Sequence, residues 1–292
     1  MTTADATPGG HSVIGGDLDV TRIGYGSMKL TGWPDGARRP ARDTALAVLR
    51  RAVELGVNHI DTSYYYNRDG VAANELIRAA LHPYPDDLVI VTKVGPIMEG
   101  DEDLKPGTRV GLTADGLRRA VEANLSSLGI DRLDLVNLRM DAAVTPEEGS
   151  MESALETLSG LRDEGLIRHL GISNVSAPQL AEAQAVAPIV SVQNLYNFGR
   201  REHDAMVDSC ARAGIAFVPF FPLSDFDDAV TARLAKVAAR RDATVPQVAL
   251  AWLLARSPSI LVIPGTGSVA HLEENIAAGQ LPLSAEDLAE LA

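Results

Sequence analysis

Short apolar runs alternate along the chain with longer segments in which apolar residues recur at helical spacing. The short runs are typical of buried strands, and the longer segments are typical of helices with one buried face. The predicted strands cover residues 20–27, 57–60, 88–92, 133–138, 167–172, 189–192, 216–219 and 260–263. Because helical segments separate the successive strands, we expect an α/β protein with parallel strands and covering helices.

Start and stop signals place the helices between these strands. The predicted helices cover residues 43–55, 72–81, 114–128, 151–164, 177–186, 202–213, 229–240, 246–256, 269–279 and 285–291. Thr113 is placed to cap one of them, and Ser176 and Thr244 each begin a capping box that has a proline in the first turn. With no linker-like break, the pattern predicts one (β/α)₈ barrel domain over residues 1–292, in which residues 1–12 form a flexible lead-in.

Polar or aromatic residues follow these strands at their carboxyl ends, where a barrel enzyme carries its active site. In chain order, the residues at or just after these ends are Asp61, Tyr66, Lys93, Arg139, Ser173, Asn174, Gln193 and Phe220. Polar residues distributed at random would not recur at the carboxyl end of strand after strand. The pattern therefore predicts an enzyme.

Asp61, Tyr66 and Lys93 suggest carbonyl chemistry. A tyrosine has an ordinary pKa of about 10, a nearby ammonium lowers that pKa, and a carboxylate can hold the ammonium in place. We therefore expect Lys93 to make Tyr66 a proton donor to a carbonyl oxygen while a hydride reaches the carbon. The alternative is structural: Asp61 caps a turn, Lys93 is solvated and Tyr66 packs at the rim.

Composition narrows the class of protein further. A formal net charge of −13 without blocks of Lys or Arg argues against nucleic acid or a membrane surface as a partner. No apolar run reaches the ~18 residues of a membrane span, and one cysteine, Cys210, fits a reducing cytoplasm. No His or Cys spacing predicts a metal site. The oligomeric state stays open.

Several segments in consistent order resemble the aldo-keto reductases. They are DTSYYY, IVTKVG, DRLDLVNL, GISN, VQNLYN, PFFPL and VIPGTGSVAHLEEN. Within the family, the chain is most similar to the bacterial branch that includes a pyridoxal reductase. The resemblance implies a TIM barrel without a Rossmann domain, a nicotinamide cofactor extended across its carboxyl face, and Asp61, Tyr66 and Lys93 as three of four catalytic residues.

The fourth catalytic position departs from the family pattern, because Arg139 stands where most members carry histidine. A guanidinium is permanently charged and offers several donors, whereas a neutral histidine donates one hydrogen bond. Arg139 would then orient and polarise the carbonyl as an electrophilic clamp. Alternatively, it pairs with Asp141 or a cofactor phosphate and leaves Tyr66 as the only donor.

The cofactor contacts are expected from side-chain chemistry and from the resemblance together. Ser173, Asn174 and Gln193 offer donors and acceptors for a carboxamide, and Phe220 offers a flat face for the nicotinamide ring. A glycine-rich turn before a helix capped by Ser268 suits phosphate. By matched position, the remaining contacts are Pro222, Leu223, Gly265, Thr266, Gly267, Ser268, His271, Glu274 and Asn275.

The identity of the cofactor and substrate is less determined. His271 stands where many family members bind the 2′-phosphate with arginine, and Glu273 adds a negative charge nearby, so NADPH is expected with NADH as a competitor. The predicted reaction reduces a small aldehyde or ketone to an alcohol, with pyridoxal as the specific candidate. Alternatives are NAD-linked oxidation in reverse, or a cofactor-binding regulatory barrel that resembles channel β subunits. The loop at 95–111 is expected to form a lid or substrate wall.

Overall fold

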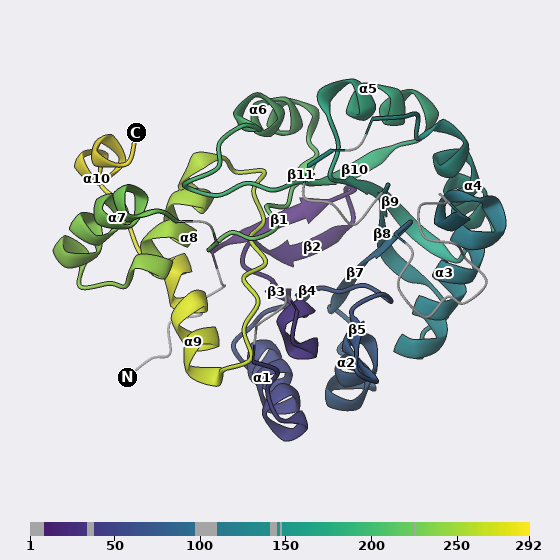
Figure 1. The fold of residues 1–292 in the computed structure, drawn as a ribbon, viewed down its shortest axis with the longest axis horizontal. Coiled ribbons are helices and arrows are strands. Elements are labelled where there is room, and N and C mark those ends of the chain that lie inside the picture. Colours follow the sequence, from purple (N-terminus) through teal and green to yellow (C-terminus); the bar gives the residue numbers. More distant parts are fainter. Residues whose placement is uncertain (1–8, 34–37, 97–109, 141–144, 147, 225) are drawn as a thin grey trace.

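The computed structural model describes residues 9–33, 38–96, 110–140, 145–146, 148–224 and 226–292. One parallel sheet has the strand order β11-β10-β9-β8-β7-β4-β3. Its strands are β3 (Tyr25–Gly26), β4 (His59–Asp61), β7 (Val89–Val94), β8 (Leu133–Arg139), β9 (Ile167–Ser173), β10 (Ile189–Gln193) and β11 (Ala216–Phe217). The sheet curls around a central axis, and helices surround its outer face (Figure 1).

The segment expected as the eighth strand closes this sheet into a barrel through short bridges. Leu261 donates a backbone hydrogen bond to Phe217 of β11 at 3.0 Å, and Val262 donates one to Arg22 at 2.9 Å, just before β3. A Cβ at Gly26 would lie 2.6 Å from the carbonyl oxygen of Ile263, so glycine permits this close approach. The predicted (β/α)₈ barrel is confirmed.

The helices follow the predicted segments closely. In the described part of the chain they are α1 (Arg42–Glu54), α2 (Ala73–Leu81), α3 (Ala114–Leu128), α4 (Glu152–Asp163), α5 (Ala177–Val186), α6 (Asp204–Ala213), α7 (Asp228–Arg241), α8 (Val245–Arg256), α9 (Val269–Ala277) and α10 (Ala285–Glu290). Thr113 caps α3, and Ser176 and Thr244 complete the capping boxes of α5 and α8 as predicted. Local side-chain chemistry therefore sets these helix starts.

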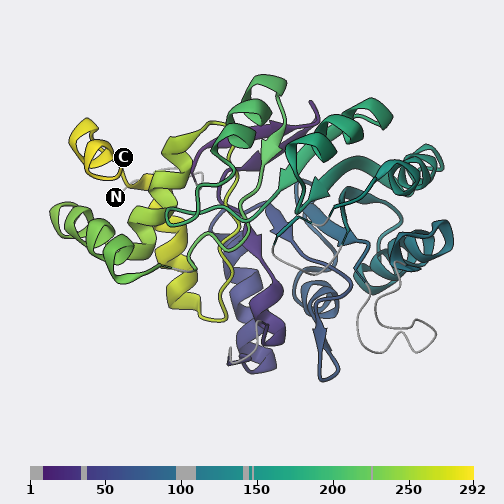
Figure 2. The ribbon, with the colours of Figure 1, turned by 45° about the horizontal axis from the view of Figure 1, so that its top comes forward.

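An antiparallel hairpin that the sequence analysis missed lies across the barrel (Figures 1 and 2). It pairs β1 (His11–Ile14) with β2 (Leu18–Thr21). Its apolar side chains pack into the inner core with residues Val89, Val91, Leu135, Ala216, Val218, Leu261 and Ile263. The strand expected over residues 20–27 is consequently divided between β2 and β3, and His11 and Ser12, expected in the flexible lead-in, belong to β1.

A second hairpin, also missed, extends from the loop after β4. It pairs β5 (Asn67–Arg68) with β6 (Val71–Ala72) through Asp69 and Gly70. Both turn residues have positive φ, at 49° and 72°. Asp-Gly with this backbone is the typical signal for a two-residue hairpin turn. Most of the predicted loop at 95–111 (residues 97–109) lies outside the described residues.

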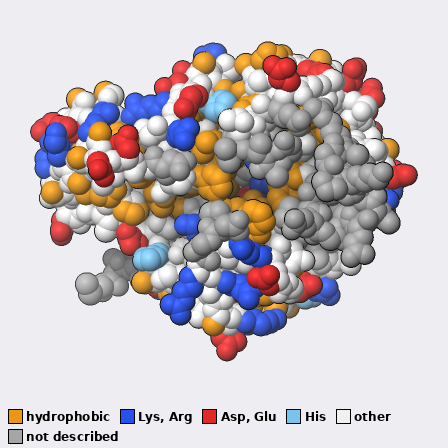
Figure 3. Space-filling view, in the orientation of Figure 1, with side chains coloured by type: hydrophobic (Ala, Val, Ile, Leu, Met, Phe, Trp, Pro, Cys, Tyr) orange, Lys and Arg blue, Asp and Glu red, His pale blue; other side chains and the backbone are white. Residues whose placement is uncertain are grey.

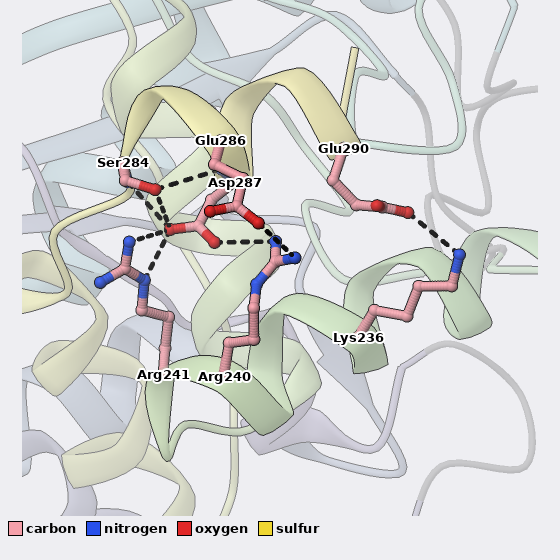
Figure 4. Close-up of polar contacts among 7 residues, drawn as sticks. All are labelled: Lys236, Arg240, Arg241, Ser284, Glu286, Asp287 and Glu290. Carbon is pink, nitrogen blue, oxygen red and sulfur yellow. Dashed lines mark hydrogen bonds and ion pairs between the residues drawn. The ribbon is translucent and has the colours of Figure 1, made fainter.

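The C-terminal helix α10 is held on α7 by charged groups (Figure 4). Asp287, which is 1% exposed, accepts hydrogen bonds from Arg240 at 2.9 Å and from Arg241 at 2.6 Å. Burial opposes the ionisation of Asp287, but the Ser284 backbone and the two arginines outweigh it and hold the pKa of the carboxyl well below its usual range. Lys236 adds an ion pair to Glu290 at 3.1 Å.

Candidate active site

One carboxylate links opposite sides of the barrel mouth. Lys93 Nζ donates to Asp61 Oδ1 at 2.6 Å and to the Thr62 carbonyl at 3.0 Å, while Gln193 Nε2 donates to Asp61 Oδ2 at 2.8 Å. Asp61 and Lys93 are only 3% and 2% exposed. Buried charges are stable only when paired and hydrogen-bonded, as they are here. Asp61 therefore positions an ammonium and an amide at once.

Tyr66 lies beside this ion pair, with its ring centroid 5.0 Å from Lys93 Nζ. Burial raises the pKa of the Tyr66 hydroxyl, Asp61 raises it further, and Arg139 opposes them. The expectation that Lys93 makes Tyr66 acidic is therefore wrong, because the ammonium lies over the ring face and Asp61 offsets its charge. The raised pKa keeps the phenol protonated at neutral pH, which is the form that a proton donor needs.

Two further tyrosines, Tyr64 and Tyr65, directly precede Tyr66 in the loop after β4. The ring of Tyr65 meets those of Tyr64 and Tyr66 edge to face, at 5.5 and 5.3 Å between centroids. Tyr64 donates its hydroxyl to the Pro96 carbonyl at 2.7 Å. Burial also raises the pKa of Tyr65. The three rings therefore form one edge-to-face cluster, in which Tyr64 is held by the Pro96 carbonyl.

Arg139 ends β8 and is 8% exposed. Its Nη1 donates to Ser173 Oγ at 3.0 Å, and its guanidinium lies 5.0 Å from the centroid of the Phe220 ring. A cation over an aromatic face is attracted by the ring quadrupole. The guanidinium therefore covers one face of Phe220, and Asp141, its alternative partner, lies outside the described residues.

The amide groups fit a nicotinamide carboxamide. Gln193 is fully buried, and its Oε1 has no hydrogen-bond partner among the described residues while Nε2 is held by Asp61. Ser173 Oγ accepts from Arg139, so its own proton can be donated to a carbonyl. Asn174 has a φ of 58°, and its Nδ2 donates to the Thr145 carbonyl at 2.8 Å. An acceptor and a donor thus remain for the carboxamide.

The segment after Phe220 was also expected to contact the cofactor. It turns at Phe221, whose φ is 54°, and continues through buried Pro222 and half-buried Leu223. Asn197 holds this turn, since its Nδ2 donates to the carbonyls of Phe221 at 2.9 Å and Ser224 at 3.0 Å. Sequence reasoning missed Asn197, although it lies in the quoted segment VQNLYN.

The glycine-rich turn at residues 265–268 leads into α9 as predicted. Ser268 Oγ accepts the backbone N–H of His271 at 3.4 Å, which confirms Ser268 as the N-cap. Tyr25 fixes the turn from inside the barrel by donating its hydroxyl to the Thr266 carbonyl at 2.6 Å. The side chain of His271 is exposed. A helix N-terminus with exposed backbone donors suits phosphate.

The acidic residues of α9 have partners that the sequence did not reveal. Glu273 pairs with Arg51 Nε at 2.8 Å. Its negative charge near the glycine-rich turn at residues 265–268 is therefore offset. Glu274 accepts a hydrogen bond from Thr244 Oγ1 at 2.5 Å, and Asn275 is 5% exposed. The negative charge of Glu273, which argued against NADPH, is therefore balanced by Arg51 of α1.

A buried polar network behind the sheet supports the strand ends, and sequence reasoning missed it. Thr62 Oγ1 donates to Asn74 Oδ1 at 2.7 Å, and Asn74 Nδ2 donates to Asn124 Oδ1 at 3.1 Å. Thr92 Oγ1 donates to the same Asn124 oxygen at 2.6 Å. The network ties α2 and α3 to the strands that carry the ion pair. The sequence signal that could have revealed this network is the presence of Asn74 and Asn124 on the apolar faces of their predicted helices.

The remaining histidines have structural surroundings, and the described residues form neither a metal site nor a membrane-spanning helix. His59 is 1% exposed, and burial lowers its pKa to about 4, so it is a buried residue that is uncharged at neutral pH. His169 lies 2.6 Å from Asp17 of the hairpin loop. Among the described residues, no group of His, Cys, Asp or Glu is arranged to hold a metal. Within those residues, no helix combines the length and apolarity needed to cross a membrane.

The barrel and the residues at its mouth together define an oxidoreductase that carries its nicotinamide site without a Rossmann domain. The chain matches the model of the Aldo/keto reductase family over residues 22–226 and 227–292, and it belongs to that family.

Relatives and solved structures agree with this assignment. Pyridoxine 4-dehydrogenase of Escherichia coli (strain K12) is 50% identical over a match of 280 residues that covers 94% of this chain and 95% of that protein. An uncharacterised oxidoreductase of Schizosaccharomyces pombe is 36% identical, over 99% of this chain and 91% of its own.

Among solved structures, a thermostable aldo-keto reductase in complex with the inhibitor epalrestat superimposes with a TM-score of 0.81 at 30% identity, over 96% of this chain and 98% of its own. An aldo-keto reductase from Klebsiella pneumoniae in complex with NADPH has a TM-score of 0.78 at 27% identity, over 96% and 93% of the two chains.

Proposed function

We propose that this protein reduces a small aldehyde to an alcohol with NADPH, and that pyridoxal is its substrate. The observation that supports this most is the shared carboxylate of Asp61. It holds Lys93 against the Tyr66 ring, and it holds Gln193 so that Oε1 has no hydrogen-bond partner in the described part of the chain. Proton donor and carboxamide site are thereby fixed relative to each other at the barrel mouth.

Tyr66 supplies the proton to the carbonyl oxygen. Its raised pKa keeps it protonated before the reaction, and the cationic side chain of Arg139 offsets the negative charge that forms on the hydroxyl as the proton leaves. Fixed charges in a site screened from water stabilise such developing charge strongly. Lys93 serves mainly to orient the ring, because its charge is already compensated by Asp61.

NADPH would supply the hydride when bound. Gln193 Oε1 would accept from its carboxamide N–H, Ser173 Oγ would donate to the carboxamide oxygen, and the face of Phe220 opposite Arg139 would pack on the ring. The turn at residues 265–268 would bind phosphate at the N-terminus of α9. Pro222, Leu223, His271, Glu274 and Asn275 complete the proposed cofactor contacts.

The choice of substrate rests on the relative that is 50% identical and named pyridoxine 4-dehydrogenase. The surface near the barrel mouth is consistent with a small ring. Figure 3 shows a hollow in the middle of this face, bordered by hydrophobic side chains. Tyr65 and Phe221 are partly exposed aromatic residues from two of the surrounding loops. A flat aromatic aldehyde matches such walls.

The test is a steady-state assay with pyridoxal and a panel of other aldehydes, each with NADPH and with NADH, followed by loss of reduced-cofactor absorbance. We expect pyridoxal with NADPH to give the highest kcat/KM. Fluorescence titration of NADPH gives the cofactor affinity in the same preparation. Tight NADPH binding without turnover of any aldehyde would contradict the proposal and favour a cofactor-binding regulator.

A further inference from the structure

Two polar side chains inside the barrel have no hydrogen-bond partner in the described part of the chain. Asn137 of β8 and Ser191 of β10 are both 0% exposed. Neither the amide oxygen nor the amide nitrogen of Asn137 is bonded, and the hydroxyl of Ser191 is not bonded either. Buried polar groups left without partners cost stability, and nearly all such groups in folded proteins are satisfied. A small ligand that supplies hydrogen bonds would remove this cost.

Both side chains point into the barrel, one layer below the residues at its mouth. Side chains two residues apart on a strand share a face. Asn137 follows Leu135 of the inner core by two residues and precedes Arg139 by two, and Ser191 precedes Gln193 by two. The two polar residues therefore lie between the apolar inner core and the candidate active site, where bulk solvent does not reach them.

Gly171 of β9 brings these two side chains together. It lies between them in the sheet, because it aligns with Asn137 on one side and with Ser191 on the other. A Cβ at this position would lie 2.1 Å from Asn137 Oδ1 and 3.0 Å from Ser191 Cβ. Its φ is not positive, so the backbone conformation does not require glycine. Glycine is needed here because the Asn137 amide occupies the space that a side chain would fill.

We propose that Asn137 and Ser191 bind buried water inside the barrel, with one molecule bridging the two side chains beside Gly171. An amide and a hydroxyl are neutral and both donate and accept hydrogen bonds, and water does the same. A buried water typically makes about three hydrogen bonds to otherwise unsatisfied polar groups. Asn137 Oδ1, Asn137 Nδ2 and Ser191 Oγ are atoms of this kind. The site needs neither cofactor nor substrate, so this inference is independent of the proposed function.

A high-resolution crystal structure of the wild type tests the site directly. We expect density for a water molecule within hydrogen-bond distance, about 2.7–3.2 Å, of both the Asn137 amide and Ser191 Oγ. A direct hydrogen bond between the two side chains would overturn the proposal, and so would an interior without density next to either. Because the wild type is used, this measurement does not depend on whether a variant folds.

Thermal unfolding shows whether the Ser191 hydroxyl has a partner in solution. Ser191→Ala should lower the Tm of the wild type by about 2 °C, the loss of one hydrogen bond in a chain of this size. In Asn137→Leu, which cannot hold the bridging water, the same change should leave Tm unchanged or raise it, because it removes a hydroxyl without a partner. A rise in the wild type as well, or an equal fall in both backgrounds, would overturn the bridge.

Thr92→Val is the matched control. Thr92 is also 0% exposed, but its hydroxyl donates directly to Asn124 on α3, outside the barrel interior. In this background Ser191→Ala should lower Tm by the same amount as in the wild type, because effects at separate sites add. If Ser191→Ala lost its effect here too, the coupling to Asn137 would not be specific and the bridge would be overturned.

Discussion

Replacing Asp61 by asparagine tests the arrangement on which the site depends. The change keeps the shape of the side chain but removes its charge, so Lys93 loses its only ion-pair partner among the described residues. Both groups are at most 3% exposed, and solvent therefore cannot take over this role. Removing one partner of a buried pair typically costs about 3–5 kcal/mol. We expect about 3 kcal/mol, since the Thr62 carbonyl keeps one hydrogen bond to the ammonium.

The same substitution should also weaken cofactor binding. Gln193 Nε2 now donates to Asp61 Oδ2, but the new amide must also satisfy Lys93 with its oxygen. Its NH₂ group would then face the NH₂ group of Gln193. Gln193 can restore a hydrogen bond only by turning over its own amide, which withdraws Oε1 from the carboxamide. Affinity for NADPH should therefore fall about 10-fold, the effect of one hydrogen bond.

Two assays measure these effects separately. Urea unfolding followed by circular dichroism gives the free energy of unfolding, and NADPH fluorescence gives Kd. Asp61→Asn combined with Lys93→Met removes the uncompensated charge, so this double variant should recover much of the lost stability. Because the new amide can then turn its oxygen to Gln193 Nε2, NADPH affinity should recover as well. If the single variant were as stable as the wild type and bound NADPH equally well, the shared-carboxylate arrangement would be refuted.

Three other predictions concern separate parts of the molecule. Tyr66→Phe should lower kcat by about 100-fold or more by removing the proton donor, while the Kd for NADPH, measured by fluorescence, stays near the wild-type value. His271→Arg should raise NADPH affinity about 5- to 10-fold through a charge-assisted contact with the 2′-phosphate, and an equal gain for NADH would contradict that placement. Asp287→Asn should loosen α10, seen as faster C-terminal proteolysis. Because the folded-state pKa of Asp287 is depressed, its stabilising effect is present above its unfolded pKa of about 4 and is lost as pH falls. Wild type and variant should therefore converge in stability in acid, and a difference that persisted there would count against the ion pairs.

Local sequence signals determined most of the helices and the positions of the reactive residues. Capping boxes at Ser176 and Thr244 set helix starts because their hydrogen bonds join residues three apart. Strand ends were visible for a similar reason, since an apolar run ending in Asp61 or Lys93 is a local pattern. These features need no knowledge of the rest of the fold.

Only the tertiary structure decided the partners of those residues. Asp61 and Gln193 are 132 positions apart, and their hydrogen bond exists because the barrel closes. The direction of the Tyr66 pKa shift followed from burial and from Asp61, which together outweigh the opposing effect of Arg139. Burial, long-range pairing and the face of a ring that a cation meets depend on three-dimensional packing, so a pattern along the chain could not determine them.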